Sequence, residues 1–140
     1  MSTAVDTSAL LAIFKAERGF ELWLDLLAER AAENRLVACD IVWAEVGSFF
    51  STFDEFHHNM DLLNVSFDPV LPETAHHAGV GFRSYRTQGG PRQHLVPDFL
   101  IGAHAEKQAS GLVTFDRGFY RRYFTELNVI APEPPYTSTG

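Results

Sequence analysis

The sequence is poor in cysteine and has no long hydrophobic run. Its one cysteine, Cys39, excludes an internal disulfide, a zinc site built from thiolates and a CxxC redox centre. No apolar run approaches the roughly 18 residues of a membrane-spanning helix, and residues 1–6 lack the basic and apolar stretches of a signal peptide. We therefore expect a soluble, cytoplasmic protein that has no membrane partner.

The sequence also lacks an excess of positive charge and the glycine-rich motifs of nucleotide-binding proteins. The formal net charge is −7, from 11 basic and 18 acidic side chains, which argues against binding nucleic acid by bulk attraction. Seven of the 11 basic residues are, however, concentrated in residues 81–125. No GxxxxGKS/T or GxGxxG motif follows a candidate strand, so an ATP- or dinucleotide-binding site has no support.

Short β-rich segments alternate with longer helical ones along the chain. This alternation predicts an α/β fold in which three layers, α/β/α, enclose a central parallel sheet of about five short strands. Strands are expected at residues 3–6, 36–39, 65–68, 112–115 and 128–131, and helices at 7–17, 20–34, 41–50, 54–63, 72–85, 98–109 and 118–124. We expect one domain over residues 1–131 and a flexible tail at 132–140, which holds three prolines.

Acidic residues follow four of the expected strands. Asp6, Asp40, Asp68 and Asp116 each stand between a strand and a helix, where an aspartate commonly caps the helix. In a parallel sheet this position is also the edge at which ligands bind. Both interpretations are open for each aspartate.

Two further acids lie within expected helices. Glu45 is flanked at helical spacing by Ile41, Val42 and Phe49, which predicts that it projects toward the packed side of its helix. A carboxylate there is costly unless it meets a cation or a hydrogen-bond donor. Asp98 opens the next-to-last expected helix, so a capping role and a role in a site are both open for it.

Convergence of Asp6, Glu45, Asp98 and Asp116 would have an electrostatic consequence. Two unit charges about 4 Å apart repel by roughly 4 kcal/mol at an effective dielectric constant of about 20, so several such pairs would cost a small domain most of its stability. Such a cluster would take up protons or bind a divalent cation. Because the ligands are hard oxygen atoms, Mg²⁺ or Mn²⁺ is favoured over zinc.

Four blocks of sequence, in this order and at this spacing, resemble the PIN-domain ribonucleases, and most of all their bacterial VapC-like toxins. The blocks are VDTSALL at residues 5–11, IVWAEV at 41–46, VPDFLIGAHA at 96–105 and LVTFDRGF at 112–119. The resemblance covers Ala4 to about Ile130 and implies the PIN-like strand order 3-2-1-4-5. Departures are small: Asp40 stands where a serine is common, Gly102 stands where alanine is frequent, and the loop 89–94 lies outside the shared motif.

The resemblance implies a metal-dependent endoribonuclease that hydrolyses phosphodiester bonds of single-stranded or structured RNA. It assigns catalysis, and the binding of one or two Mg²⁺ or Mn²⁺ ions, to Asp6, Glu45, Asp98 and Asp116. Nearby hydroxyls that would orient these carboxylates or a water belong to Thr7, Ser8 and Thr114. The strands that end at Asp6 and Asp116 would be neighbours, so we interpret Asp40 and Asp68 as helix caps.

Candidate RNA contacts lie in the basic part of the chain. They are Arg92, His94, Arg117, Arg121 and Arg122. A solvated helix face is an equally good interpretation of the arginines on the short helix after Asp116.

The resemblance also implies protein partners. Toxins of this kind belong to type II toxin–antitoxin pairs, form homodimers, and are silenced by an antitoxin that lays a helix into a groove. We expect most of a group of helical aromatic residues to be core and the surplus to line that groove or the dimer face: Trp43, Phe49, Phe50, Phe53 and Phe56.

Other residues with metal-binding potential have simpler interpretations. Adjacent residues of a helix point about 100° apart, so the histidine pairs at 57–58 and 76–77 are poor chelators and are interpreted as surface or half-buried residues. Cys39 is interpreted as a small buried residue at the end of a strand.

Two other classes of function remain open. The chain could be a PIN-like module that binds RNA or a partner without cutting it. It could also be a Mg²⁺-dependent phosphotransfer domain, although it lacks the second aspartate two residues after Asp6 that such phosphatases carry, and the lysine of receiver domains.

Overall fold

The computed structural model describes residues 1–132 and contains one five-stranded parallel sheet. The strands are β1 Ser2–Val5, β2 Arg35–Ala38, β3 Val65–Phe67, β4 Leu112–Val113 and β5 Val129–Ile130. Their order is β3-β2-β1-β4-β5, which confirms the predicted topology. Ala4 in the central strand pairs with Val37 of β2 on one side and with Leu112 of β4 on the other. The expected tail at 132–140 lies, apart from its first residue, outside the described residues.

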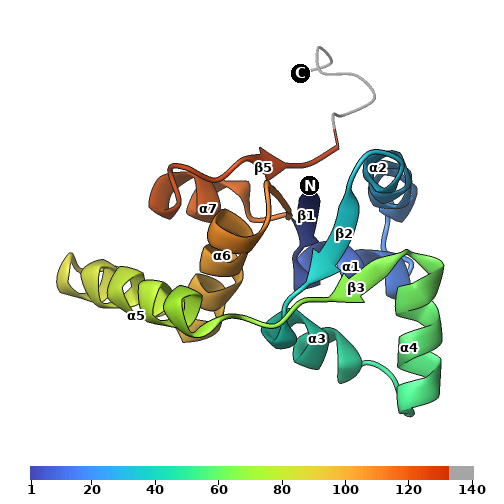
Figure 1. Ribbon diagram of the computed structural model, residues 1–140, viewed down its shortest axis with the longest axis horizontal. Helices are drawn as coiled ribbons and strands as arrows, with labels where there is room; N and C mark the ends of the chain where they lie inside the picture. The colour runs from blue at the N-terminus through green and yellow to red at the C-terminus, as the bar shows by residue number, and fades with distance from the viewer. Residues whose placement is uncertain (133–140) are drawn as a thin grey trace.

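Seven helices connect the strands within residues 1–132. They are α1 Thr7–Phe14, α2 Phe20–Ala31, α3 Asp40–Gly47, α4 Phe53–Leu62, α5 Pro72–Thr87, α6 Val96–Gln108 and α7 Arg117–Tyr123. Figure 1 shows α5, α6 and α7 on one side of the sheet and α1, α2 and α4 on the other, so the fold has the three layers that the sequence predicts. None of these helices is both long and apolar enough to span a membrane.

The direction of the connections explains the layers. The chain steps from β1 to β2 to β3 in one direction and then returns past β1 to β4. Because such crossovers are right-handed, reversing the direction moves the connecting helices to the opposite face of the sheet. The reversal lies between β1 and β4, and open α/β sheets bind their ligands outside the carboxyl ends of strands at this kind of point.

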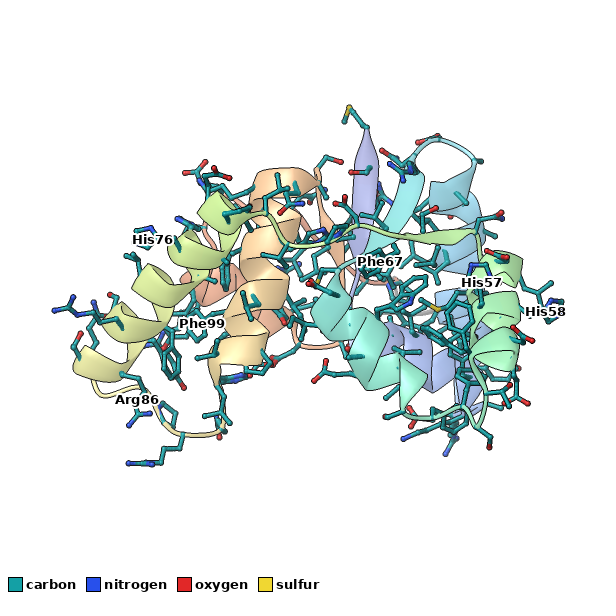
Figure 2. All side chains as sticks on the ribbon, turned by 60° about the horizontal axis from the view of Figure 1, so that its bottom comes forward. His57, His58, Phe67, His76, Arg86 and Phe99 are labelled. Atoms are coloured by element: carbon teal, nitrogen blue, oxygen red, sulfur yellow. The ribbon has the colours of Figure 1, made fainter. Side chains whose placement is uncertain are left out.

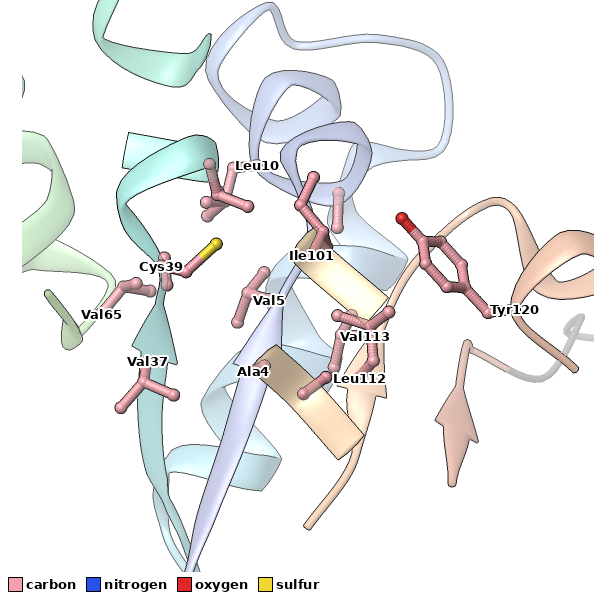
Figure 3. Packing of buried hydrophobic residues seen from close by; sticks show 14 of the residues in the cluster. Ala4, Val5, Leu10, Val37, Cys39, Val65, Ile101, Leu112, Val113 and Tyr120 are labelled. Atoms are coloured by element: carbon pink, nitrogen blue, oxygen red, sulfur yellow. The ribbon is translucent and has the colours of Figure 1, made fainter. Parts of the chain in front are cut away.

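The core consists of the apolar strands and the helix faces that cover them. Val5, Val37, Leu112 and Val113 are almost completely buried because the central strands have helices on both faces (Figure 3). Burying one side chain of this size contributes about 1.5–3 kcal/mol relative to leaving it exposed. The sheet is thus a rigid platform for the residues that follow β1 and β4.

The glycine at position 102 has a packing reason. A Cβ atom added to Gly102 would lie only 2.4 Å from the ring of Phe124. Real Cβ atoms do not approach so closely, and the aromatic ring is itself buried. The ring of Phe124 therefore occupies the space that an alanine side chain would need in α6.

The aromatic residues of α3, α4 and the segment between these helices divide into core and surface. Phe56 is buried, and the partly buried rings of Trp43 and Phe50 lie 5.0 Å and 5.8 Å from it. Phe49 and Phe53 remain 45% and 66% exposed. The expectation that most of this group is core therefore holds for Trp43, Phe50 and Phe56. Phe49 and Phe53 form the exposed surplus.

The four histidines of the adjacent pairs are all exposed, as predicted. Figure 2 shows His58 extending from α4 away from the rest of the molecule, and His76 on the surface of α5. Cys39 directly follows β2 and is 1% exposed. Burial raises the pKa of its thiol to about 11, so the thiol is protonated at neutral pH.

Candidate active site

Asp6 lies at the carboxyl end of β1 and is the N-cap of α1. Its Oδ1 accepts a hydrogen bond of 2.7 Å from the backbone N–H of Thr7. Its Oδ2 accepts hydrogen bonds from the hydroxyls of Ser8 at 3.2 Å and Thr114 at 2.6 Å. Asp6 is 6% exposed. Burial raises the pKa of its carboxyl to about 6, although the three hydrogen bonds act in the opposite direction.

Hydroxyl groups join the ends of β1 and β4. Thr114 is fully buried just after β4, and its Oγ1 accepts a hydrogen bond of 3.0 Å from the backbone N–H of Asp116. The Oγ of Ser8 accepts one of 3.1 Å from the backbone N–H of Phe115. The segment that leads to Asp116 is therefore fixed against the Asp6 carboxylate at the reversal point of the sheet.

Glu45 is exposed, so the prediction that it projects toward the packed side of α3 is wrong. The buried face of this helix is formed by Val42 and Val46, and Glu45 lies beside that face, nearer to α1. Its Oε1 accepts a hydrogen bond of 2.6 Å from the hydroxyl of Thr7. Because Thr7 also donates its backbone N–H to Asp6, one residue of α1 holds two of the four predicted acids.

Asp98 and Asp116 form a second pair of acids. Asp98 is the third residue of α6 instead of its N-cap, and its Oδ2 accepts the backbone N–H of Leu95 at 3.0 Å. Asp116 is the N-cap of α7, and its Oδ1 accepts the backbone N–H of Phe119 at 3.4 Å. Each of the two carboxylates thus accepts a backbone N–H at the beginning of its helix, as the capping interpretation predicts.

The imidazole ring of His94 lies between these two carboxylates. Its Nδ1 is 3.4 Å from Oδ2 of Asp98, and its Nε2 is 3.8 Å from Oδ2 of Asp116. Both distances exceed those of ordinary hydrogen bonds, about 2.7–3.2 Å. The ring is stacked on Phe119, with centroids 3.8 Å apart and planes 14° apart. His94 is therefore held by stacking and by proximity to two negative charges.

A buried tyrosine links the two pairs electrostatically. Burial raises the pKa of the Tyr120 hydroxyl well above its ordinary value, and the negative charges of Asp6, Asp98, Asp116 and Glu45 raise it further. Figure 3 shows this hydroxyl turned toward the end of the sheet at which the strands finish. All four carboxylates thus act on one point of the structure, and no feature of the sequence marks Tyr120 for this position.

The residue types fit a divalent cation. Asp6, Glu45, Asp98 and Asp116 offer only hard oxygen donors, and their negative charges add to the effect of burial in raising the pKa of the Tyr120 hydroxyl. Within residues 1–132, however, no three His, Cys, Asp or Glu side chains are arranged as ligands of a single ion. The acids stand in two pairs, one on Thr7 and one beside His94.

The interpretation of Asp40 and Asp68 as helix caps is wrong. Asp40 is already the first residue of α3, and its Oδ1 accepts the backbone N–H of Val70 at 3.2 Å. Asp68 is hydrogen-bonded to Nε2 of the buried His104 in α6 at 2.8 Å. Both aspartates hold the connection between β3 and α5 in place, a role that depends on partners far away in the sequence.

The predicted RNA-contacting arginines are exposed, and none of them pairs with a carboxylate of the described residues. Within residues 1–132, no arginine or lysine nitrogen lies within 4.0 Å of a carboxylate oxygen, and the ion pairs found there all involve histidine. The exposed arginines are Arg92, Arg117, Arg121 and Arg122. Their charges are therefore available to an external anion.

A parallel α/β domain with carboxylates at its topological reversal point defines the class of protein. The sequence matches the family model of the PIN domain over residues 3–125. The chain belongs to the PIN domain family. A sequence search among curated proteins found no match.

Solved structures with the same fold come from toxin–antitoxin complexes. A chain of VapBC2 from Rickettsia felis, bound to a promoter DNA fragment, has a TM-score of 0.70 and 18% identity, with coverage of 95% of this chain and 100% of that one. VapBC-1 from nontypeable Haemophilus influenzae gives 0.69 and 23%, with coverage of 94% and 98%. A toxin–antitoxin complex from Klebsiella pneumoniae gives 0.66 and 17%, with coverage of 94% and 98%. The fold is therefore VapC-like, in agreement with the resemblance seen in the sequence.

Proposed function

We propose that this protein is a Mg²⁺- or Mn²⁺-dependent endoribonuclease and the toxin of a type II toxin–antitoxin pair. The observation that carries the proposal is the Asp6 carboxylate, which is buried at the reversal point of the sheet and is joined to Glu45 through Thr7. A carboxyl group whose pKa is raised by burial is a feature of functional sites. The shared fold with chains of toxin–antitoxin complexes supports the antitoxin partner.

The acids would hold the metal ions and the other groups would orient them. When bound, Mg²⁺ or Mn²⁺ would lower the pKa of an attacking water and stabilise charge on the leaving oxygen. The hydroxyls of Ser8 and Thr114 donate hydrogen bonds to Asp6, and the hydroxyl of Thr7 donates one to Glu45. These three residues would therefore orient the two carboxylates. The Cys39 thiol, protonated at neutral pH, is not available as a nucleophile.

The proposal is tested by cleavage of labelled single-stranded RNA with Mg²⁺ or Mn²⁺, compared with EDTA. We expect Asp6→Asn and Asp116→Asn to lose activity at least about 100-fold. Removing a residue that only orients a metal ligand costs about 10- to 100-fold, and removing a ligand should cost more. Asp40→Asn is the matched control, because this strand-end aspartate accepts one backbone hydrogen bond that an amide oxygen can also accept. Cleavage at the wild-type rate by both site variants would overturn the proposal.

Toxicity and partner binding are tested in cells. Expression in a bacterial host should arrest growth, Asp6→Asn should remove the arrest, and coexpression of a small neighbouring open reading frame should restore growth. Binding of RNA by the wild type and by Asp6→Asn with no cleavage by either would favour a non-catalytic module.

We also propose a homodimer. The exposed rings of Phe49 and Phe53 provide apolar surface next to the site helix α3. Sedimentation velocity at micromolar concentration tests this, and a monomer whose Phe49→Ser and Phe53→Ser variants behave identically would contradict it.

A further inference from the structure

A pocket of about 400 Å³ opens beside Asp116, between α7, the end of α5 and the loop that leads to α6. Gln93 and His94 line it from the loop, and Arg122 and Tyr123 line it from α7. Its volume is at the lower end of the range for small-molecule sites, about 300–1,000 Å³. It therefore has room for one group of the size of a nucleotide.

The wall of this pocket is aromatic, and its side chains pack against one another. Tyr123 packs edge-on against the buried Tyr85, with centroids 5.0 Å apart. The hydroxyl of Tyr85 donates a hydrogen bond to the carbonyl of Pro91, which ties the loop to α5. Gly90 permits this close approach, because a Cβ atom there would lie 2.6 Å from the Tyr85 ring. A pocket built this way is formed before any ligand enters.

The charges in the pocket are separated. The guanidinium carbon of Arg122 lies 5.4 Å from the centroid of the Tyr123 ring and has no carboxylate partner within residues 1–132. Asp116, with 48% of its side chain exposed, supplies the negative charge. A phosphate fits beside the arginine but is repelled by the aspartate, whereas an uncharged base with N–H donors fits beside the aspartate.

We propose that this pocket binds one unpaired nucleotide of the RNA, next to the phosphate that is cleaved. Its phosphate contacts Arg122, and its base lies against Tyr123 and the amide of Gln93. The inference rests on the proposed function and adds a substrate requirement to it. Since one nucleotide fills the space, the base has to be unstacked, which selects single-stranded segments over duplex RNA.

The chain provides a matched pair of variants to test the phosphate contact. Arg121 and Arg122 are adjacent exposed residues of α7, and only Arg122 lines the pocket. In an Asp6→Asn background, which prevents cleavage, binding of labelled ten-nucleotide RNAs is measured by fluorescence anisotropy in EDTA. We expect Arg122→Gln to weaken binding about 10-fold and to reduce the slope of log K against log salt concentration by about 0.7. Arg121→Gln, which removes a candidate phosphate contact outside the pocket, should weaken binding by less than about 3-fold.

A second experiment tests whether a base occupies the pocket. Each nucleotide of the RNA is replaced in turn by an abasic one. One position should weaken binding at least about 5-fold in the Asp6→Asn protein, and the same substitution should have little further effect once Gln93→Ala has been added. This non-additivity identifies direct contact.

The outcomes separate the two proposals. Equal effects of Arg121→Gln and Arg122→Gln, or the lack of a sensitive position, would overturn the nucleotide pocket. Loss of antitoxin binding without loss of RNA binding in Arg122→Gln would also overturn it and would assign the pocket to a protein side chain. A wild-type protein that cleaves no RNA but shows the expected binding pattern would refute the nuclease and retain the pocket.

Discussion

Replacing Asp6 by asparagine should inactivate the protein and stabilise it. The carboxyl has a pKa of about 6 in the folded protein and 3.8 in a solvated chain, a difference of about two. Each pKa unit corresponds to about 1.4 kcal/mol, so the ionised side chain costs the folded state about 3 kcal/mol at pH 7. The asparagine side chain removes this charge and keeps the shape of the side chain.

The pH dependence follows from the sign of the pKa change. The folded state binds the Asp6 proton more tightly than the unfolded state, so this residue makes stability fall as the pH rises between 3.8 and about 6. The cost is absent below that window and complete above it. The difference in stability between Asp6→Asn and wild type should therefore be near zero at pH 4 and about 3 kcal/mol at pH 7.

The assay is urea unfolding in EDTA, followed by the fluorescence of Trp23 and Trp43. We expect a higher urea midpoint for Asp6→Asn at pH 7, with an unchanged slope, and equal midpoints near pH 4. Asp40→Asn should show no such divergence, because its carboxylate accepts only an exposed hydrogen bond. An Asp6→Asn protein that is less stable than wild type at pH 7 would refute the conclusion that the buried charge is costly.

Three further predictions concern packing, metal and a buried hydrogen bond. Gly102→Ala should lower the free energy of unfolding by about 1–3 kcal/mol because its Cβ would meet Phe124, whereas Gly79→Ala, whose Cβ meets nothing within 4 Å, should be neutral or stabilising; urea unfolding of both checks this. Mg²⁺ at about 100 times its dissociation constant should add about 2.7 kcal/mol to stability, and Asp116→Asn should remove most of this gain in thermal melts. His104→Leu should lose about 1–3 kcal/mol in the same melts, because its buried hydrogen bond to the β3–α5 connection has no replacement.

The local pattern of apolar residues in the sequence was sufficient to predict the strands, the helices and the class of fold. Each expected strand and helix is present within residues 1–132, because the apolar runs of the strands and the helical spacing between them reflect burial directly. Boundaries differ where helix ends depend on backbone conformation. Helix α1 ends at Phe14, three residues early, since Ala16 and Gly19 adopt positive φ values of 49° and 85°. The order of the strands came from the resemblance to a family and not from periodicity.

The same pattern gave wrong predictions for side chains whose partners are distant in the sequence. The neighbours of Glu45 along its helix are apolar, yet only Val42 and Val46 face the core and the carboxylate turns to Thr7, 38 positions away. The cap interpretation of Asp68 failed because the buried His104 competes for the same carboxylate. Such contacts depend on how whole helices pack, and a pattern within one helix does not record that packing.

The segment outside the family motif affects the site as much as the motif does. The loop 88–95 lies outside the four motif blocks, yet it places His94 between Asp98 and Asp116 and provides one wall of the pocket beside them. Its position depends on Tyr85, whose ring and hydroxyl hold the loop. The motif residues would supply the chemistry, whereas the loop supplies part of the surface around it. Differences in RNA preference between members of the family should therefore follow this loop and α7 more closely than the four acids.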